Sequence, residues 1–255
     1  MKYLTLLIGS LLFLFNTALA QVAEKKMQRI NAGIYTPFFK TETGKPIKVS
    51  EFWLDETAVT NLEFLEFVKA NPNWSRSKVN RLFADTNYLR HWETDFEIGE
   101  ENKDIYNSPV VYVSWFAAKA YCKWKGKRLP TVAEWELAGN APPKNQKISS
   151  ITEYLIDWYK KPTQERLPNI KSTYCNTYGL YDMHGLVWEW TFDFNSYVSN
   201  GDSRVTKEDD RLLFCAAAPL NVKDRSDYAA FLRFGYRGSL KGNYCISGLG
   251  FRCAK

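Results

Sequence analysis

Many motifs that mark common classes of enzyme are missing from this chain of 255 residues. It has no G-x-x-x-x-G-K-[ST] loop and no G-x-G-x-x-G fingerprint, so nothing indicates a phosphate or dinucleotide site. No G-x-S-x-G elbow supports a hydrolase. Only two histidines occur, His91 and His184, and we expect both to be structural or surface residues rather than metal ligands. The chain also lacks a dense run of lysines and arginines with interleaved aromatics, which argues against nucleic acid as a partner.

Cysteines are few, and none of their spacings is a C-x-x-C, which excludes a zinc ribbon and a thioredoxin-type motif. An oxidising compartment would permit disulfides. Because the number is odd, at least one thiol is free or is paired outside the chain. The five are Cys122, Cys175, Cys215, Cys245 and Cys253.

Long apolar runs are absent after the N-terminal region, whose pattern predicts a secretory signal at residues 1–20. Lys2 supplies the positive charge, residues 4–15 are apolar, and Ala18 and Ala20 form an A-x-A cleavage site before Gln21. A membrane anchor is the alternative, but the run is short for a bilayer span. We therefore expect a periplasmic or secreted protein with no membrane span after cleavage. Removal of Lys2 lowers the formal charge from +6 to +5, since 33 basic residues then face 28 acidic ones.

The hydrophobic pattern predicts a mixed fold of short strands, a few helices and long loops. Residues 28–39 and 47–54 alternate as strands do, while three helices begin after Thr60, Ser114 and Thr131. Thr60 and Thr131 are each followed three residues later by a glutamate, which is the pattern of a capping box. A further helical segment is expected at residues 151–159. These elements together indicate the α+β class.

Five segments in order resemble one family, the formylglycine-generating, sulfatase-modifying-factor proteins. Residues 178–190 (YGLYDMHGLVWEW) resemble the family's GLYDMxGNVWEW. The other four are residues 59–64 (VTNLEF), 108–124 (SPVVYVSW and AYCKW), 126–136 (GKRLPTVAEWE) and 250–253 (GFRC). Residues 83–92 and 227–234 resemble secreted relatives encoded near copper nitrite reductases. The resemblance implies an irregular, loop-rich, C-type-lectin-like α+β domain over residues 28–255.

The same resemblance implies a disulfide between Cys122 and Cys253, because both match family positions that pair. It leaves Cys175, Cys215 and Cys245 unassigned. In the catalytic members two cysteines bind copper, and these positions are expected at Ala229 and Phe234 here. Neither side chain can ligate a soft metal, so copper is not expected. The nearby Arg233, Tyr236 and Arg237 have a basic, aromatic character that suits a peptide or an anionic group.

A cation site is predicted around the glycine turn at residues 182–189. Asp182 and Glu189 supply carboxylates, and Gly185 and Val187 can turn their carbonyls inward, which is the oxygen-rich environment that Ca²⁺ prefers. The resemblance implies a structural Ca²⁺ there, although Leu186 stands where the family usually has asparagine. A salt-bridged Glu189 without metal is the alternative.

We therefore expect an exported accessory or maturation protein that binds a protein or peptide client without catalysis. An oxidoreductase of the same family that uses a different site, including one that generates formylglycine, is the alternative. The missing cysteine pair favours the first, and metal analysis of the purified protein would discriminate the two.

Overall fold

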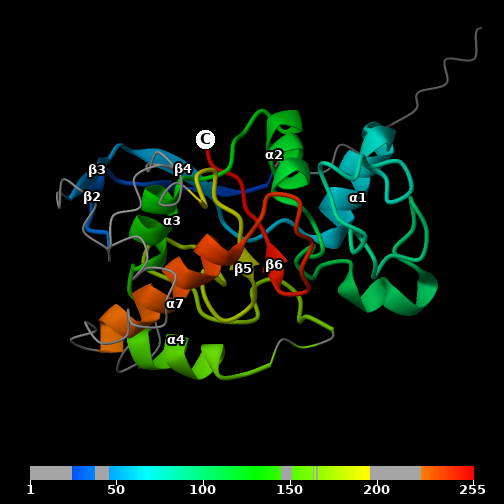
Figure 1. Cartoon of the computed structure of the whole chain (residues 1–255). Helices are drawn as coiled ribbons and strands as arrows, with labels where there is room; N and C mark the ends of the chain where they lie inside the picture. Colours follow the sequence, from blue (N-terminus) through cyan, green and yellow to red (C-terminus); the bar gives the residue numbers. More distant parts are fainter. Residues whose placement is uncertain (1–24, 38–45, 145–150, 163, 165, 196–224) are drawn as a thin grey trace, which may run out of the picture.

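The computed structural model describes residues 25–37, 46–144, 151–162, 164, 166–195 and 225–255, and three small two-stranded sheets lie within these residues (Figure 1). Strands β1 (Met27–Ile30) and β4 (Phe52–Asp55) pair antiparallel, with Met27 opposite Asp55. β2 (Gly33–Tyr35) and β3 (Ile47–Val49) also pair antiparallel. β5 (Trp188–Glu189) and β6 (Leu249–Gly250) pair parallel, which brings residues 188–190 beside residues 249–253.

Three helices begin where the sequence predicts them, because their caps are local. Thr60 closes a capping box with Glu63 at the start of α1 (Asn61–Ala70), and Thr131 does so with Glu134 at the start of α3 (Val132–Gly139). Ser114 caps α2 (Trp115–Trp124) by accepting a hydrogen bond from the Ala117 amide. The expected segment at residues 151–159 is the helix α4 (Ile151–Tyr159).

The sequence did not predict α7 (Arg225–Ser239) as a helix, nor the short 3-10 helices η1 (Pro72–Trp74) and η2 (Glu100–Ile105). In Figure 1, α7 lies against α4, and α3 packs beside the β2–β3 pair. Apart from these elements, the described chain consists mainly of turns and loops, which agrees with the irregular α+β class. No helix in the described ranges is long and apolar enough to cross a membrane.

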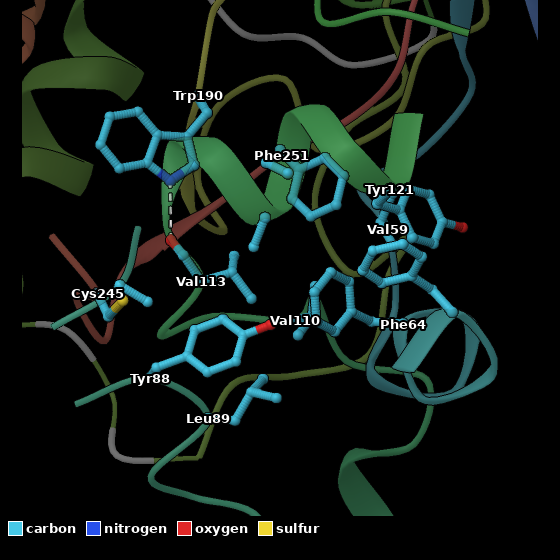
Figure 2. Packing of buried hydrophobic residues seen from close by; sticks show 14 of the residues in the cluster. Val59, Phe64, Tyr88, Leu89, Val110, Val113, Tyr121, Trp190, Cys245 and Phe251 are labelled. Carbon is cyan, nitrogen blue, oxygen red and sulfur yellow. Dashed lines mark hydrogen bonds between the residues drawn. The ribbon is translucent and has the colours of Figure 1, made fainter. Parts of the chain in front are cut away.

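The largest core cluster is rich in aromatic rings and draws its members from residues 59–253 (Figure 2). Phe64 of α1 and Tyr121 of α2 stack with ring centroids 5.8 Å apart, and Phe251 packs edge-on against both. Trp190 is fully buried, and its indole Nε1 donates to the Val113 carbonyl at 2.9 Å. The core therefore depends on residues near the C-terminus as much as on α1 and α2.

Two of the expected features lie outside the described residues: the signal at 1–20 and Cys215. The strand expected at residues 28–39 is described only as far as residue 37. Within the described part it forms two strands, β1 and β2, rather than one.

Candidate functional site

Glu189, the middle residue of the segment that reads WEW, forms a buried ion pair with Arg252. Arg252 Nε donates to both Glu189 carboxylate oxygens, at 2.9 and 2.8 Å, and neither side chain is exposed. Trp135 Nε1 donates to Glu189 Oε2 at 2.7 Å. The parallel pairing of β5 with β6 produces this geometry, because it aligns Glu189 with Gly250, two residues before the arginine. A carboxylate buried in this way requires such a partner.

Asp182 is held separately, by donors of its own loop. Its carboxylate accepts hydrogen bonds from the Thr173 amide and hydroxyl, both at 2.8 Å, and from the Lys171 amide. Asp182 has a φ of +55° and Gly185 one of +99°, so the turn passes through left-handed conformations. At Gly185 the Tyr154 hydroxyl occupies the space of a Cβ, which explains why glycine is required.

This arrangement favours the alternative to the predicted cation site. Both carboxylates are engaged by protein donors, and the Arg252 guanidinium would repel a cation beside Glu189. Asp182, Gly185, Val187 and Glu189 therefore do not fit a Ca²⁺ site as they stand. Among the residues that the structure describes, no three His, Cys, Asp or Glu side chains gather as a metal site. The role of calcium stays a prediction.

The disulfide joins Cys122 of α2 to Cys253, the pair that the family resemblance implies. The two Cα atoms are 5.6 Å apart and both residues are fully buried. Cys175 and Cys245 are free thiols, the first half-buried and the second buried. Burial is the main cause that raises the pKa of Cys245 far above its ordinary value, so this thiol is held in its unreactive form.

Both positions that the resemblance assigns to copper thiolates lie on α7. Ala229 is buried and Phe234 is half-buried. A methyl group and a phenyl ring offer no lone pair to a metal. Helix α7 instead contributes two arginines to the interior.

Arg233 and Arg237 converge on a single buried carboxylate, Glu136 of α3. Arg233 donates through Nε at 3.0 Å and through Nη2 at 2.8 Å, and Arg237 donates through Nη1 at 2.6 Å. Burial by itself would raise the pKa of Glu136, but the two guanidinium groups outweigh it and lower the pKa to about 2. The arginines were expected to form a basic pocket for a peptide, yet at 4% and 9% exposure they face Glu136 instead. Sequence reasoning missed Glu136, the last residue of the GKRLPTVAEWE segment.

Three rings stack beside these arginines and form the back of a groove. Trp188 stacks on Tyr159 of α4 at 5.0 Å between centroids and on Tyr236 of α7 at 4.2 Å. In front of them a groove of about 470 Å³ runs between α4 and α7. Its lining is mainly aromatic and aliphatic: Ile156, Tyr159, Lys160, Trp188, Tyr228, Phe231, Leu232, Gly235 and Tyr236.

Both histidines are interior hydrogen-bonding residues that belong to different networks. His184 Nε2 donates to the Gly139 carbonyl at 3.1 Å, and burial, followed by the charge of Arg233, lowers its pKa to about 3. His91 Nε2 donates to Asn61 Oδ1 at 2.9 Å, and burial lowers its pKa to about 4. Both rings are therefore neutral at physiological pH.

Comparison with known families defines the class of the protein. The profile of the "Sulfatase-modifying factor enzyme 1-like domain" matches residues 18–255, and the chain belongs to that family. Among curated relatives, it is 31% identical over 188 residues to the formylglycine-generating enzyme of Streptomyces coelicolor, covering 59% of this chain and 60% of that enzyme. It is 29% identical over 227 residues to the bovine inactive C-alpha-formylglycine-generating enzyme 2, covering 74% of this chain and 75% of the relative.

Solved structures of similar architecture include PvdO from Pseudomonas aeruginosa, with 22% identity and a TM-score of 0.49 over 89% of this chain and 93% of that one. The family assignment rests on the sequence match rather than on this likeness. The chain spans about 60% of the length of the Streptomyces relative.

Proposed function

We propose that this member of the family is exported and binds a protein or peptide client without catalysing its oxidation. The observation that carries the proposal is the groove between α4 and α7. It lies beside the same helix whose positions Ala229 and Phe234 are the expected places of the copper thiolates. A groove is thus present at this helix, whereas neither of these positions offers a soft ligand.

The groove has properties that suit an apolar segment of a client. Its volume of about 470 Å³ is in the range of ordinary ligand pockets. Tyrosine and tryptophan rings supply large contact areas with a polar edge, and such rings dominate binding energy at protein interfaces. Trp188 is fixed between Tyr159 and Tyr236, so little side-chain entropy is lost when a ligand packs against it.

The named relatives include both an enzyme and an inactive protein, so their names do not decide whether this chain is catalytic. The Streptomyces protein carries the name of an active enzyme and the bovine protein that of an inactive one. The residues on α7 therefore carry the argument for a non-catalytic role.

Catalysis is tested by incubating the purified protein with a sulfatase-motif peptide, copper and oxygen, followed by mass spectrometry. We expect no aldehyde above the control without protein. Aldehyde formation would overturn the non-catalytic role, and stoichiometric copper or iron in the purified protein would favour the oxidoreductase alternative.

Binding is tested by selection from a displayed peptide library on immobilised protein. Tyr228 lines the groove and is 39% exposed, so Tyr228→Lys changes the surface with little effect on the core. Leu82→Lys is the matched control, because Leu82 is 76% exposed and does not line the groove. We expect peptides that bind the wild type and the Leu82 variant but not the Tyr228 variant. Equal binding to all three would place the client elsewhere and contradict the role of the groove.

Export is tested on the full chain expressed with its residues 1–20. N-terminal sequencing of the mature protein should begin at Gln21, because the A-x-A site ends at Ala20. A protein that keeps Met1 would contradict cleavage at this site.

A further inference from the structure

The cluster of Glu136, Arg233 and Arg237 carries an excess positive charge inside the protein. Two guanidinium groups face one carboxylate, and Glu136 stays ionised because its pKa is lowered to about 2. His184 lies near these charged groups, and because its pKa is lowered to about 3 it is neutral and adds no charge to the cluster. One net positive charge is thus left in a region where an unpaired charge costs several kcal/mol.

Two hydrogen-bond donors next to this charge have no hydrogen-bond acceptor. They are Nη1 of Arg233 and the hydroxyl of Tyr159, both buried atoms without a hydrogen-bond partner among the described residues. Arg233 comes from α7 and Tyr159 from α4. The guanidinium lies close enough to the tyrosine hydroxyl to interact with it, but no well-formed hydrogen bond joins Nη1 to the hydroxyl, whose own proton has no acceptor. Buried donors of this kind are rare in native proteins and call for an acceptor that the polypeptide does not supply.

A small enclosed cavity lies where these groups meet. Arg233, Arg237 and Tyr159 line it together with His184, Trp188 and Tyr236, and it has room for a single water-sized particle. The Glu189 carboxylate also lines it, but the charge of that carboxylate is balanced by Arg252. Rings of Tyr159, Trp188 and Tyr236 line both this cavity and the groove, so the cavity lies behind the aromatic stack.

We propose that this cavity binds one chloride-sized anion, held by Arg233 Nη1 and the Tyr159 hydroxyl. A water molecule would accept from both donors but would leave the net charge uncompensated. A monoatomic anion accepts from both and neutralises the charge, and hydrogen bonds to an ion are about twice as strong as those between neutral groups. Sulfate and organic anions are too large for a space of one atom.

The anion has a structural role at this place. Tyr159 ends α4, Arg233 lies in the middle of α7, and Glu136 lies in α3. An ion that bridges the first two residues holds α4 against α7, and these are the helices that enclose the groove. Halide binding therefore stabilises the folded state and fixes the shape of the groove.

The experiment compares thermal unfolding of the full mature chain in sodium chloride, sodium bromide and sodium gluconate at equal ionic strength. A halide at ten times its dissociation constant should raise Tm by about 3–5 °C for a chain of this size, and the shift should saturate with concentration. General salt effects on stability are separated from binding by the variants. Tyr159→Phe removes one donor and should abolish most of the difference between halide and gluconate. Tyr228→Phe, a groove tyrosine outside the cavity, should keep it.

Arg233→Met leaves the neutral pair of Glu136 and Arg237 and should remove the difference entirely; if that variant does not fold, Tyr159→Phe still decides. Crystals soaked in bromide should show an anomalous peak between Arg233 and Tyr159. Equal Tm values in chloride and gluconate for the wild type would overturn the proposal. So would the same halide shift in wild type and Tyr159→Phe, or a bromide crystal that shows only water in the cavity.

Discussion

Replacing Glu189 by glutamine keeps the shape of the side chain but removes its negative charge. The Arg252 guanidinium, which is completely buried, then loses its counter-ion while it remains in the core. Breaking a buried pair by removing one partner costs about 3–5 kcal/mol, because the other charge is left uncompensated. Glutamine retains one acceptor for Trp135 Nε1 or Arg252 Nε, so the effect measured is mainly that of the charge.

A loss of this size should lower Tm by about 6–20 °C, since 1 kcal/mol corresponds to about 2–4 °C in a chain of this length. The matched control is Glu51→Gln, which breaks the exposed pair with Arg29. That pair has an even shorter distance, 2.6 Å, but its side chains are 45% and 59% exposed, and we expect no measurable change. Burial rather than distance decides the outcome.

The assay is thermal unfolding followed by circular dichroism, in calcium and in chelator. If the main role of Glu189 is to pair with Arg252, Glu189→Gln should lower Tm by the same amount in calcium and in chelator. A wild-type Tm that rises with calcium, together with loss of that rise in Glu189→Gln, would refute this reasoning and restore the cation site. A double variant, Glu189→Leu with Arg252→Met, should regain part of the stability. It should not regain all of it, because Arg252 also donates to the Tyr181 carbonyl at 2.9 Å.

Three further predictions concern the elements around the site. Cys122→Ser removes the disulfide with Cys253, whose sequence separation of 131 residues gives a loop worth about 4–5 kcal/mol in the chain-entropy model; a denaturant midpoint that does not fall would contradict it. Thr131→Ala removes the cap of α3 and should cost about 1 kcal/mol, with Thr131→Ser as the control that restores most of it. The folded-state pKa of Glu136 is lowered to about 2 from an ordinary value of 4.5, so its contribution is complete above pH 4.5 and is lost as pH falls towards 2. Stability curves measured from pH 7 to pH 2 should therefore converge for wild type and Glu136→Gln, and parallel curves would show that this carboxylate does not titrate as described.

Local signals in the sequence predicted the elements that depend on local chemistry. The capping boxes at Thr60 and Thr131 identify helix starts within one residue, because the interacting groups are three positions apart. Helix α7 was missed because Gly235 and Gly238, which lie within it, lower its helix propensity and because its sequence lacks a comparable capping signal.

The candidate site was predicted less well because its partners are distant in sequence. Arg233 lies 97 residues from Glu136, and Arg252 lies 63 residues from Glu189. A carboxylate in a glycine turn can serve a cation or an arginine equally well, and only the pairing of β5 with β6 distinguishes the two. The resemblance to the family identified the pairing of Cys122 with Cys253, which the spacing of the cysteines alone does not.

The segment from β6 to the C-terminus passes through the middle of the molecule (Figure 1). Ala254 bridges Leu54 and Arg128, while the Lys255 carbonyl accepts from the Trp53 amide at 2.9 Å. A chain growing from the ribosome therefore cannot complete its core until residues 249–255 have emerged. We therefore expect stable folding to follow the synthesis of this segment. Because residues 254 and 255 pair with Leu54, Arg128 and Trp53, we expect a chain that ends before residue 249 to have an incomplete core and to be more sensitive to protease than the wild type.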